Sequence, residues 1–224
     1  GAILDYSVEG AKTEVGFDNN AKEILQTFEA SKENRSLPFC VFKVTGMADS
    51  QLLEKIQNKE KLTEEEKAAF ERVRKRVDSI CAKAYEYKEL VLIDAEETWI
   101  QNPIDELTYE MMRKYNKDFA VVFNTFQMYR VDMLTNLRNA HHDAAMHNYY
   151  LGVKMVRGAY MEKERERAEQ MGYPDPIQPT KQATDDSFNK GLSFCIDNKQ
   201  RISLMCGSHN DYSNKYLTVL MQKH

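Results

Sequence analysis

The stretch GVKMVRGAY, residues 152–160, predicts the central strand of an α/β fold. Its apolar and β-branched residues up to Val156 are typical of a strand, which ends at Gly158 and an aromatic residue, and a charged helical pattern follows at once. Because burying a cation is costly, we expect Lys154 and Arg157 to face an anion or the mouth of a cavity. In parallel α/β sheets and barrels, such places lie at the carboxyl ends of strands.

Strand patterns alternate with helical patterns along the rest of the chain. Such alternation implies parallel strands joined by right-handed crossovers. It fits an open doubly wound sheet and a closed eight-stranded barrel equally well, and six repeats do not choose between them. The other expected strands cover residues 2–6, 39–44, 90–93, 119–123 and 202–206. One helix is expected to start near Asp18, one follows a Thr63–Glu66 capping box, and one carries Pro103 in its first turn. The other expected helices cover residues 49–57, 129–147, 161–170 and 180–198.

Composition excludes several classes of protein. The 224 residues suffice for one large domain or two small ones, and a net charge of -4 argues against a nucleic-acid partner. The basic run at residues 72–76 lies in an acidic helix, so it predicts a solvated face and not a nucleic-acid patch. There is no apolar run of about twenty residues that would span a bilayer. No signal or transit pattern opens the sequence, which can begin after one.

Cysteine and histidine spacing disfavours a disulfide frame and a metal site. The four cysteines are widely spaced among apolar residues without a CxxC pair, which predicts buried thiols. His141, His142 and His147 miss the i, i+4 spacing that puts two ligands on one helix face. No GxGxxG or GxxxxGK[ST] loop occurs, so a Rossmann turn and a P-loop are unsupported.

Polar residues stand at or just beyond the expected strand ends. In a parallel barrel they converge on one mouth, where cations, amides and an aromatic face hold a ligand. Some have structural alternatives: Asp94 can cap a helix, Asn124 can satisfy a turn, and Tyr160 can belong to the core. The set comprises Asp5, Lys43, Asp94, Asn124, Lys154, Arg157, Tyr160, Ser208 and His209.

Two other kinds of chemistry are compatible with parts of this set. A lysine at a barrel strand end is also the nucleophile of Schiff-base aldolases, and repulsion by Arg157 and Lys43 would favour its reactive neutral form. Spacing alone leaves both roles of Lys154 open. His209 beside Ser208 suggests a nucleophile pair, but neighbours on a strand point to opposite faces, which disfavours serine-hydrolase chemistry.

Taken in order, these segments resemble the proline dehydrogenase family of flavoenzymes, particularly its eukaryotic branch. The resemblance runs over essentially all 224 residues. Weaker matches lie at residues 3–6, 43–45 and 179–184. The strongest matches are VKMVRGAY at 153–160, IDAE at 93–96, FNTFQ at 123–127 and SHN at 208–210.

The resemblance implies a distorted (β/α)8 barrel that holds FAD at its strand ends. By position, Lys154 matches a cation beside flavin N5, and Asn124 matches a carboxamide near the flavin ring. Asp94 matches an active-site aspartate. Lys43 matches a lysine that pairs with the proline carboxylate, and Tyr160 matches an aromatic residue of the substrate pocket. Further cofactor contacts are implied for Gln127, Arg157, Gly158, Ala159, Thr180, Thr184, Ser208 and His209.

The implied reaction is hydride transfer from the carbon next to the proline nitrogen to FAD, which gives pyrroline-5-carboxylate. The family passes the electrons to a membrane quinone, which implies peripheral contact with the matrix side of the mitochondrial inner membrane.

The resemblance is incomplete at one end. The family needs eight strand–helix units and an adjacent arginine pair that clamps the proline carboxylate, and no such pair occurs in this sequence. We therefore expect a barrel catalytic domain over residues 1–224 without its C-terminal units, which by itself binds proline poorly. A catalytically impaired flavin-binding relative, acting as a scaffold or regulator, stays open as the alternative.

Overall fold

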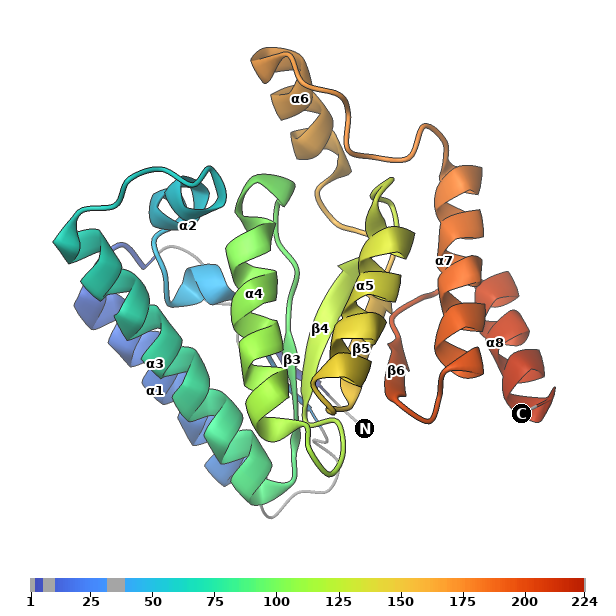
Figure 1. Ribbon diagram of the computed structural model, residues 1–224, viewed down its shortest axis with the longest axis horizontal. Coiled ribbons are helices and arrows are strands. Elements are labelled where there is room, and N and C mark those ends of the chain that lie inside the picture. Colours follow the sequence, from blue (N-terminus) through green and yellow to red (C-terminus); the bar gives the residue numbers. More distant parts are fainter. Residues whose placement is uncertain (1–2, 6–10, 32–38, 224) are drawn as a thin grey trace. The chain divides into compact units, whose positions relative to one another are not determined.

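The computed structural model describes residues 3–5, 11–31 and 39–223. These residues form an α/β fold in which six strands alternate with helices (Figure 1). They divide into two compact units. The first contains residues up to Asn116 together with Val121–Asn124, and the second contains Lys117–Ala120 and the residues from Thr125 onward. Strand β4, Val122–Gln127, contributes residues to both.

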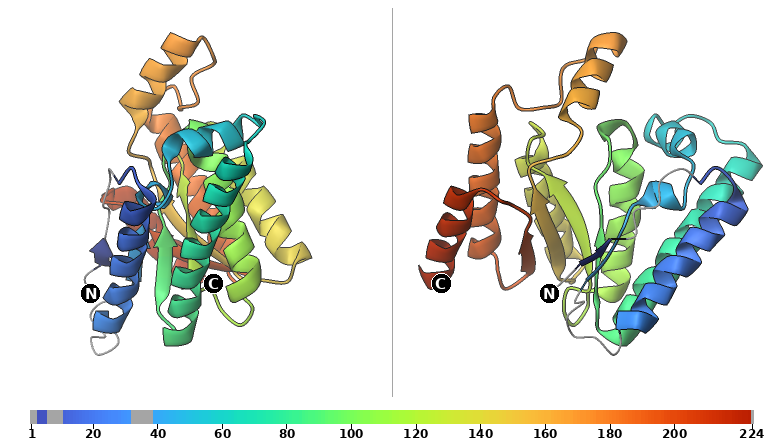
Figure 2. Two further views of the ribbon diagram at one scale, coloured as in Figure 1. Left: turned by 90° about the vertical axis from the view of Figure 1, so that its left-hand side faces the viewer. Right: turned by 180° about the vertical axis from the view of Figure 1, so that it is seen from behind.

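The first unit is a parallel sheet with helices packed on it. β1 pairs with β2, β2 with β3, and β3 with the start of β4, all in parallel. Helix α1 lies along α3, and α2 packs on α4 (Figures 1 and 2). The elements are β1 (Ile3–Asp5), α1 (Glu14–Ser31), β2 (Phe39–Phe42), the 3-10 helix η1 (Val44–Gly46), α2 (Ser50–Gln57), α3 (Glu64–Tyr87), β3 (Leu90–Ile93) and α4 (Thr98–Tyr115).

The second unit is built on the parallel pair β5 and β6. Leu151 lies opposite Ile202, and Met155 lies opposite Cys206. Helices α7 and α8 lie side by side, and α5 packs on β5 and α7 (Figures 1 and 2). The elements are α5 (Met133–Met146), β5 (Leu151–Val156), α6 (Met161–Met171), α7 (Lys181–Asp197), β6 (Ile202–Cys206) and α8 (Asp211–Lys223).

Apolar strands and helix stripes fill the core of each unit. β3 has the predicted bounds, and its residues 91–93 are fully buried, as expected of a strand covered on both faces. The predicted capping box starts α3: the Thr63 N–H donates to Glu66 Oε2 at 2.8 Å, and the Glu66 N–H donates to Thr63 Oγ1 at 3.2 Å. Other large buried side chains are Phe28, Phe42, Leu53 and Ile80 in the first unit and Tyr149 and Phe188 in the second.

Strand β4 begins and ends later than predicted. It was expected over residues 119–123, whereas it runs from Val122 to Gln127. The buried Asn116 side chain explains the late start, because its Oδ1 accepts the N–H groups of Val121 and Val122 at 3.0 and 2.9 Å. These bonds occupy backbone groups that would otherwise join the sheet. Because the strand extends to Gln127, Asn124 and Gln127 lie inside it and not beyond it.

Two helix starts were also predicted wrongly. Helix α4 begins at Thr98, so Pro103 lies inside it and not in its first turn. Helix α5 begins at Met133 and not at Tyr129, because the Tyr129 N–H donates to the Arg157 carbonyl at 2.7 Å and Arg130 forms an antiparallel bridge with Ile177.

Near the N-terminus, two further bounds differ from the prediction. Helix α1 begins at Glu14, four residues before the expected start, and β2 ends at Phe42 because Val44 already belongs to η1. Ala2 and Tyr6, the expected ends of the first strand, lie outside the described residues.

The basic run in α3 is not a uniformly solvated face, which corrects the prediction. Arg76 is 7% exposed and forms ion pairs with Glu14 and Asp18 of α1, the latter at 2.8 Å. Its guanidinium also lies over the Phe17 ring, 5.6 Å from the centroid. These residues hold α1 against α3, so the arginine is structural.

The cysteines are thiols at three buried positions and one half-buried position. Cys40, Cys81 and Cys195 are buried as predicted, whereas Cys206 is half-buried. Burial raises the pKa of Cys195 to about 12, which keeps that thiol unreactive at neutral pH. Over the described ranges, no helix is long and apolar enough to cross a bilayer.

Candidate active site

In the first unit, the strand ends bring three predicted site residues to nearly the same level of the sheet. Phe42 lies opposite Ile93, and Ile93 lies opposite Asn124. The Asp94 N–H donates to the Phe42 carbonyl at 2.9 Å, so Asp94 and Lys43 follow directly after their strands. Lys43 and Asp94 are half-buried, and Asn124 is 1% exposed.

A buried glutamate joins the ends of β2 and β3. Glu96 is 3% exposed, and its carboxylate accepts the Thr45 N–H at 3.0 Å as well as the Thr45 hydroxyl. Burial raises the pKa of Glu96 to about 7; the bonds from Thr45 and the charge of Lys43 act against this rise, and Glu97 adds to it. The carboxyl group is therefore divided between its two protonation states at neutral pH.

The same series of hydrogen bonds continues through α4 to β4. The Glu96 N–H donates to Gln101 Oε1 at 2.7 Å, and Gln101 Nε2 donates to Asp105 Oδ1 at 2.8 Å. Asn124 Nδ2 donates to the same Asp105 oxygen at 2.8 Å. Asn124 therefore does not stabilise a turn, because it lies in β4 and its carboxamide donates a hydrogen bond to Asp105 of α4.

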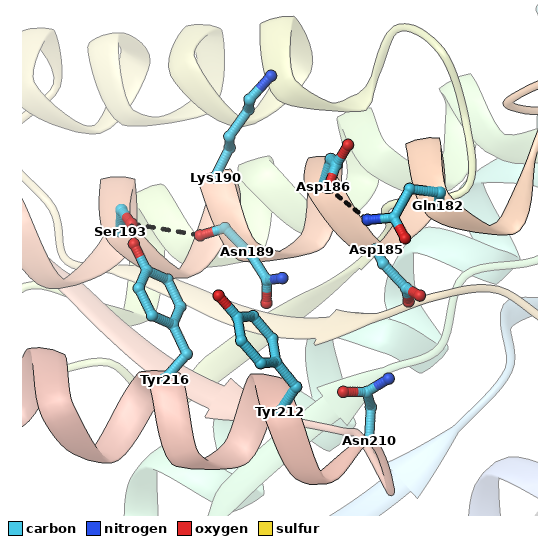
Figure 3. A pocket seen from close by; sticks show the side chains of 9 residues that line it. All are labelled: Gln182, Asp185, Asp186, Asn189, Lys190, Ser193, Asn210, Tyr212 and Tyr216. Carbon is cyan, nitrogen blue, oxygen red and sulfur yellow. Dashed lines mark hydrogen bonds between the residues drawn. The ribbon is translucent and has the colours of Figure 1, made fainter.

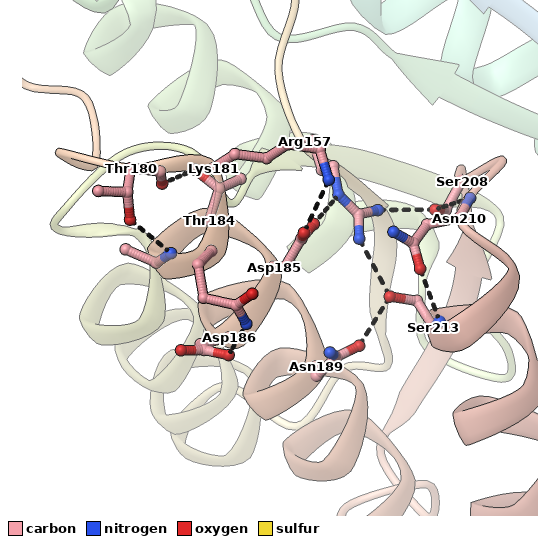
Figure 4. Close-up of polar contacts among 12 residues, drawn as sticks. Arg157, Thr180, Lys181, Thr184, Asp185, Asp186, Asn189, Ser208, Asn210 and Ser213 are labelled. Carbon is pink, nitrogen blue, oxygen red and sulfur yellow. Dashed lines mark hydrogen bonds and ion pairs between the residues drawn. The ribbon is translucent and has the colours of Figure 1, made fainter.

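In the second unit, Arg157 is the centre of a second network, shown in Figure 4. Its Nε donates to Asp185 Oδ1 at 2.6 Å, and its Nη1 donates to Ser208 Oγ at 2.7 Å. Its Nη2 donates to Ser213 Oγ at 3.0 Å, and its guanidinium lies 4.4 Å from the centroid of the Phe188 ring. The anion that Arg157 was expected to face is, within the protein, the Asp185 carboxylate.

Hydrogen bonds among the neighbours of Arg157 complete this network. The buried Ser213 hydroxyl donates to Asn189 Oδ1 at 2.8 Å, and the Ser213 N–H donates to Asn210 Oδ1 at 3.0 Å. The Asn210 N–H donates to Ser208 Oγ at 3.1 Å. The end of β6 and the start of α8 are thereby tied to Arg157, at the end of β5 (Figure 4).

Cationic partners lower the pKa of the Asp185 carboxyl group. Burial acts to raise the pKa of Asp185, but the hydrogen bonds and charges of Arg157 and Lys181 outweigh it, so the pKa lies below its usual range. Lys181 Nζ lies 3.0 Å from Asp185 Oδ2 and contributes from one turn earlier in α7.

Position 158 requires glycine because of its backbone conformation and its closeness to the Tyr129 ring. Its φ is +141°, and a Cβ added there would meet the Tyr129 ring at 2.5 Å. Gly158 and Ala159 are both exposed, so the backbone beside Arg157 is accessible without a large side chain over it.

Of the other predicted site residues of the second unit, two have local roles in α7. Thr180 caps α7 by accepting the Ala183 N–H at 3.1 Å, and the buried Thr184 donates to the Thr180 carbonyl at 3.4 Å. Tyr160 precedes α6 and is half-buried, so it is not a core residue. The remaining three are Lys154, half-buried in β5, Gln127, 2% exposed in β4, and His209, exposed beside Ser208.

The loop at residues 172–179 is fixed to the segment after β4. The Val131 N–H donates to the Pro176 carbonyl at 3.0 Å, and the Gln178 N–H donates to the Tyr129 carbonyl at 2.6 Å. This proline-rich segment is a loop, and backbone hydrogen bonds hold it in place.

A polar groove of about 520 Å³ lies between α7 and α8 (Figure 3). Tyr212 and Tyr216 stack along one side, with ring centroids 6.2 Å apart, and Asp185 connects the groove to Arg157. Its lining residues are Gln182, Asp185, Asp186, Asn189, Lys190, Ser193, Asn210, Tyr212 and Tyr216.

Several polar residues of these networks were not identified from the sequence. Asp185 had a readable signal, because Lys181 precedes it by four residues on a helix. Gln101 and Ser213 had none, since isolated polar residues in helical patterns are usually solvent-facing. Among the described residues, no group of three or more potential metal ligands gathers.

Comparison of the chain with known proteins points to one family. The family model described as proline dehydrogenase matches residues 1–224. The chain is 38% identical over 168 residues to proline dehydrogenase 1, mitochondrial, of Drosophila melanogaster, covering 70% of this chain and 25% of that protein. It is 32% identical to the protein of the same name from Caenorhabditis elegans, covering 97% and 36%.

A bacterial relative and a solved structure extend this likeness. The carbapenem antibiotics biosynthesis protein CarD of Pectobacterium carotovorum is 33% identical over 94% of this chain and 55% of its own length. The crystal structure of proline utilization A from Bdellovibrio bacteriovorus, inactivated by N-propargylglycine, superposes with a TM-score of 0.83 at 16% identity, covering 99% of this chain and 24% of that one. That neighbour has the predicted TIM-barrel-like fold.

The chain thus spans between a quarter and about half the length of these curated relatives. Its strand-end motifs, its parallel α/β fold and the match over all its residues agree with one another. This chain belongs to the proline dehydrogenase family.

Proposed function

We propose that the protein containing this chain oxidises L-proline to pyrroline-5-carboxylate with FAD as the hydride acceptor. Membership of the proline dehydrogenase family supports the reaction. The observation that carries the cofactor assignment is the bond between Arg157 and Ser208 at the ends of neighbouring strands, beside the exposed backbone of Gly158 and Ala159.

The chemistry of these donors fits a flavin dinucleotide. Ser208 Oγ accepts two hydrogen bonds, from Arg157 and from Asn210, so its own proton is directed to a further acceptor such as a phosphate oxygen. The guanidinium adds positive charge, and the small residues beside it allow a flat or extended ligand to approach the backbone. We assign Gln127, Thr180, Thr184 and His209 to the same cofactor.

The two lysines would act on opposite partners. We assign Lys154 to stabilise the negative charge that develops on the cofactor ring, which is the largest contribution that a fixed cation makes to catalysis. Lys43 would bind the proline carboxylate, with Asp94 and Tyr160 lining the substrate side. Asn124 would contact the flavin ring. FAD, when bound, supplies the redox chemistry by taking the hydride, and the chain's own residues bind and orient the substrate.

We propose that both units belong to one barrel catalytic domain over residues 1–224. The carboxyl ends of parallel strands share one face of a barrel, and that face is where barrel enzymes hold their substrates. We further propose a quinone as the electron acceptor and the matrix side of the mitochondrial inner membrane as the location. The mitochondrial names of the insect and nematode relatives support the compartment.

Flavin absorbance tests the proposed reaction. The purified protein is titrated with FAD, and L-proline is then added without oxygen. We expect a yellow complex that proline bleaches, slowly for this chain alone because it lacks adjacent arginines to clamp the substrate carboxylate. Lys154→Met should retain the yellow complex and slow bleaching about a hundredfold. Lys75→Met, which removes an exposed lysine of α3, is the matched control and should bleach like the wild type.

A flavin-binding relative without turnover is the second candidate, and the absence of an adjacent arginine pair favours it. A yellow complex that proline does not bleach would support this candidate, and a colourless protein would contradict both. A substrate adduct trapped on Lys154 by borohydride would instead support Schiff-base chemistry.

A further inference from the structure

The Asn124 carboxamide is held by a side chain that the proposed function has not used. Asn124 Nδ2 donates to Asp105 Oδ1 at 2.8 Å, and Asn124 is 1% exposed. Asp105 lies on α4, two turns after the helix begins, and is half-buried.

This contact distinguishes the two ends of the amide. A carboxylate oxygen only accepts hydrogen bonds, so it selects the NH2 end of Asn124 and turns the carbonyl oxygen away. A flipped amide would place its oxygen against the Asp105 oxygen, and burial keeps water from relieving that repulsion. Asp105 thereby decides which group Asn124 presents on its other side.

Asp105 is itself oriented by a buried neighbour. Gln101, 2% exposed, donates its Nε2–H to the same Asp105 oxygen at 2.8 Å. Gln101 Oε1 accepts the Glu96 N–H at 2.7 Å, and this bond fixes the Gln101 amide in turn. A connected series that starts at the loop after β3 therefore acts on the orientation of Asn124.

We propose that Asp105 is a positioning residue for the cofactor site. Asp105 holds the Asn124 carboxamide in the orientation that offers the amide oxygen, and not the NH2 group, to a hydrogen-bond donor at the flavin ring. This proposal rests on the proposed function, because it needs Asn124 to lie beside a flavin. Asp105 acts through Asn124 and would not touch the cofactor.

A double-mutant cycle on FAD binding tests this role. Asp105→Asn has nearly the same shape but offers a donor as well as an acceptor, so it lets the Asn124 amide take either orientation. We expect Asp105→Asn to weaken FAD binding about tenfold and to shift the visible spectrum of the bound flavin. In an Asn124→Ala background, the same change should have no further effect on affinity or spectrum. Glu106→Gln, an exposed acid next to Asp105, is the control and should leave both unchanged.

A measurement without FAD distinguishes the two ways of failing. The side-chain NH2 signal of Asn124 in the NMR spectrum should be protected from solvent exchange in the wild type and in Glu106→Gln, and lose its protection in Asp105→Asn. A wild-type protein that does not bind FAD would overturn the proposed function and this role with it. A protein that binds FAD while Asp105→Asn and Asn124→Ala act additively, or while the Asn124 signal is unchanged in Asp105→Asn, would overturn the positioning role alone.

Discussion

The two polar networks hold strand ends by opposite arrangements of charge. In the first unit, the Glu96 carboxylate accepts hydrogen bonds from Thr45, a neutral residue, and burial raises its pKa to about 7. In the second unit, Asp185 receives its bonds from Arg157 and Lys181, and its pKa lies below its usual range in spite of burial. Neutral donors leave desolvation as the larger influence, whereas cationic donors override it.

Because of this difference, we expect the stability of the two units to respond to different changes. A network centred on one guanidinium depends on that group, because each partner contacts Arg157 directly or through one bond. The network of Glu96, Gln101 and Asp105 is a series in which each side chain contacts the next. We expect stability to depend on charge in the second unit and on protonation in the first.

Replacing Arg157 should have the largest effect. Arg157→Met removes the ion pair with Asp185 and two hydrogen bonds, and it leaves a carboxylate that is 15% exposed without its main partner. We expect the free energy of unfolding to fall on the order of 3 kcal/mol in urea titrations. Arg165→Met is the matched control, since the Arg165–Asp175 pair is 40% and 42% exposed and should contribute less than about 1 kcal/mol. Equal losses in both variants would contradict the central role of Arg157.

The pH dependence of stability should separate the two carboxyl groups. The pKa of Glu96 rises on folding from 4.5 to about 7, so the native state binds the proton more tightly and stability falls as pH rises through this interval. The fall should be on the order of 3 kcal/mol in the wild type and absent in Glu96→Gln. Asp185 gives the opposite sign, because its lowered pKa stabilises the fold above its ordinary value of 3.8 and loses that contribution as pH falls further. Urea titrations between pH 3 and 8 measure both, and a Glu96→Gln variant that keeps the wild-type slope would contradict the first assignment.

Gly158→Ala tests how closely the backbone beside Arg157 is constrained, and Gly172→Ala, at the end of α6, serves as its comparison. Gly158→Ala should cost about 2 kcal/mol of unfolding free energy, because its φ is +141° and the new methyl group meets the Tyr129 ring. Gly172→Ala should cost about 1 kcal/mol, since its φ is +72° and no atom lies within 4 Å of the added Cβ. Thermal unfolding compares the two, and the reverse order would show that the Tyr129 contact is not a constraint.

A smaller effect than that of Arg157→Met is expected at Ser213. Ser213→Ala removes the acceptor of the Arg157 Nη2 bond and the donor to Asn189, and it should cost about 1 kcal/mol. In an Arg157→Met background, the cost should shrink, because one of its partners is already gone. Additive losses in urea titrations would show that Ser213 acts independently of Arg157.

Much of the fold could be predicted because its signals are local. The apolar runs at residues 90–93 and 202–206 have the predicted bounds, and the Thr63 capping box forms. The start of β4 could not be predicted, since it depends on the Asn116 side chain bonding to the backbone five and six residues later. Arg76 was misjudged for a similar reason, because its acidic partners lie in α1, at least 58 residues away.

The candidate site was predictable at strand ends and not on helices. Arg157 and Ser208 stood out because polar residues directly after apolar strands are unusual, and the structure brings their side chains together. Asp185 and Asn189 lie on α7 among other polar residues, where sequence alone does not show which of them face β5 and β6. Asp105 escaped notice for the same reason in α4.

Calorimetric titration of the purified protein with FAD tests the central claim most directly. We predict saturable binding of one FAD per chain. Ser208→Ala should weaken this binding about tenfold, because it removes an oriented hydroxyl donor. The exposed Ser79 of α3 supplies the control, since Ser79→Ala should leave the affinity unchanged. Absence of saturable binding, or equal affinities for all three proteins, would contradict a flavin site at these strand ends.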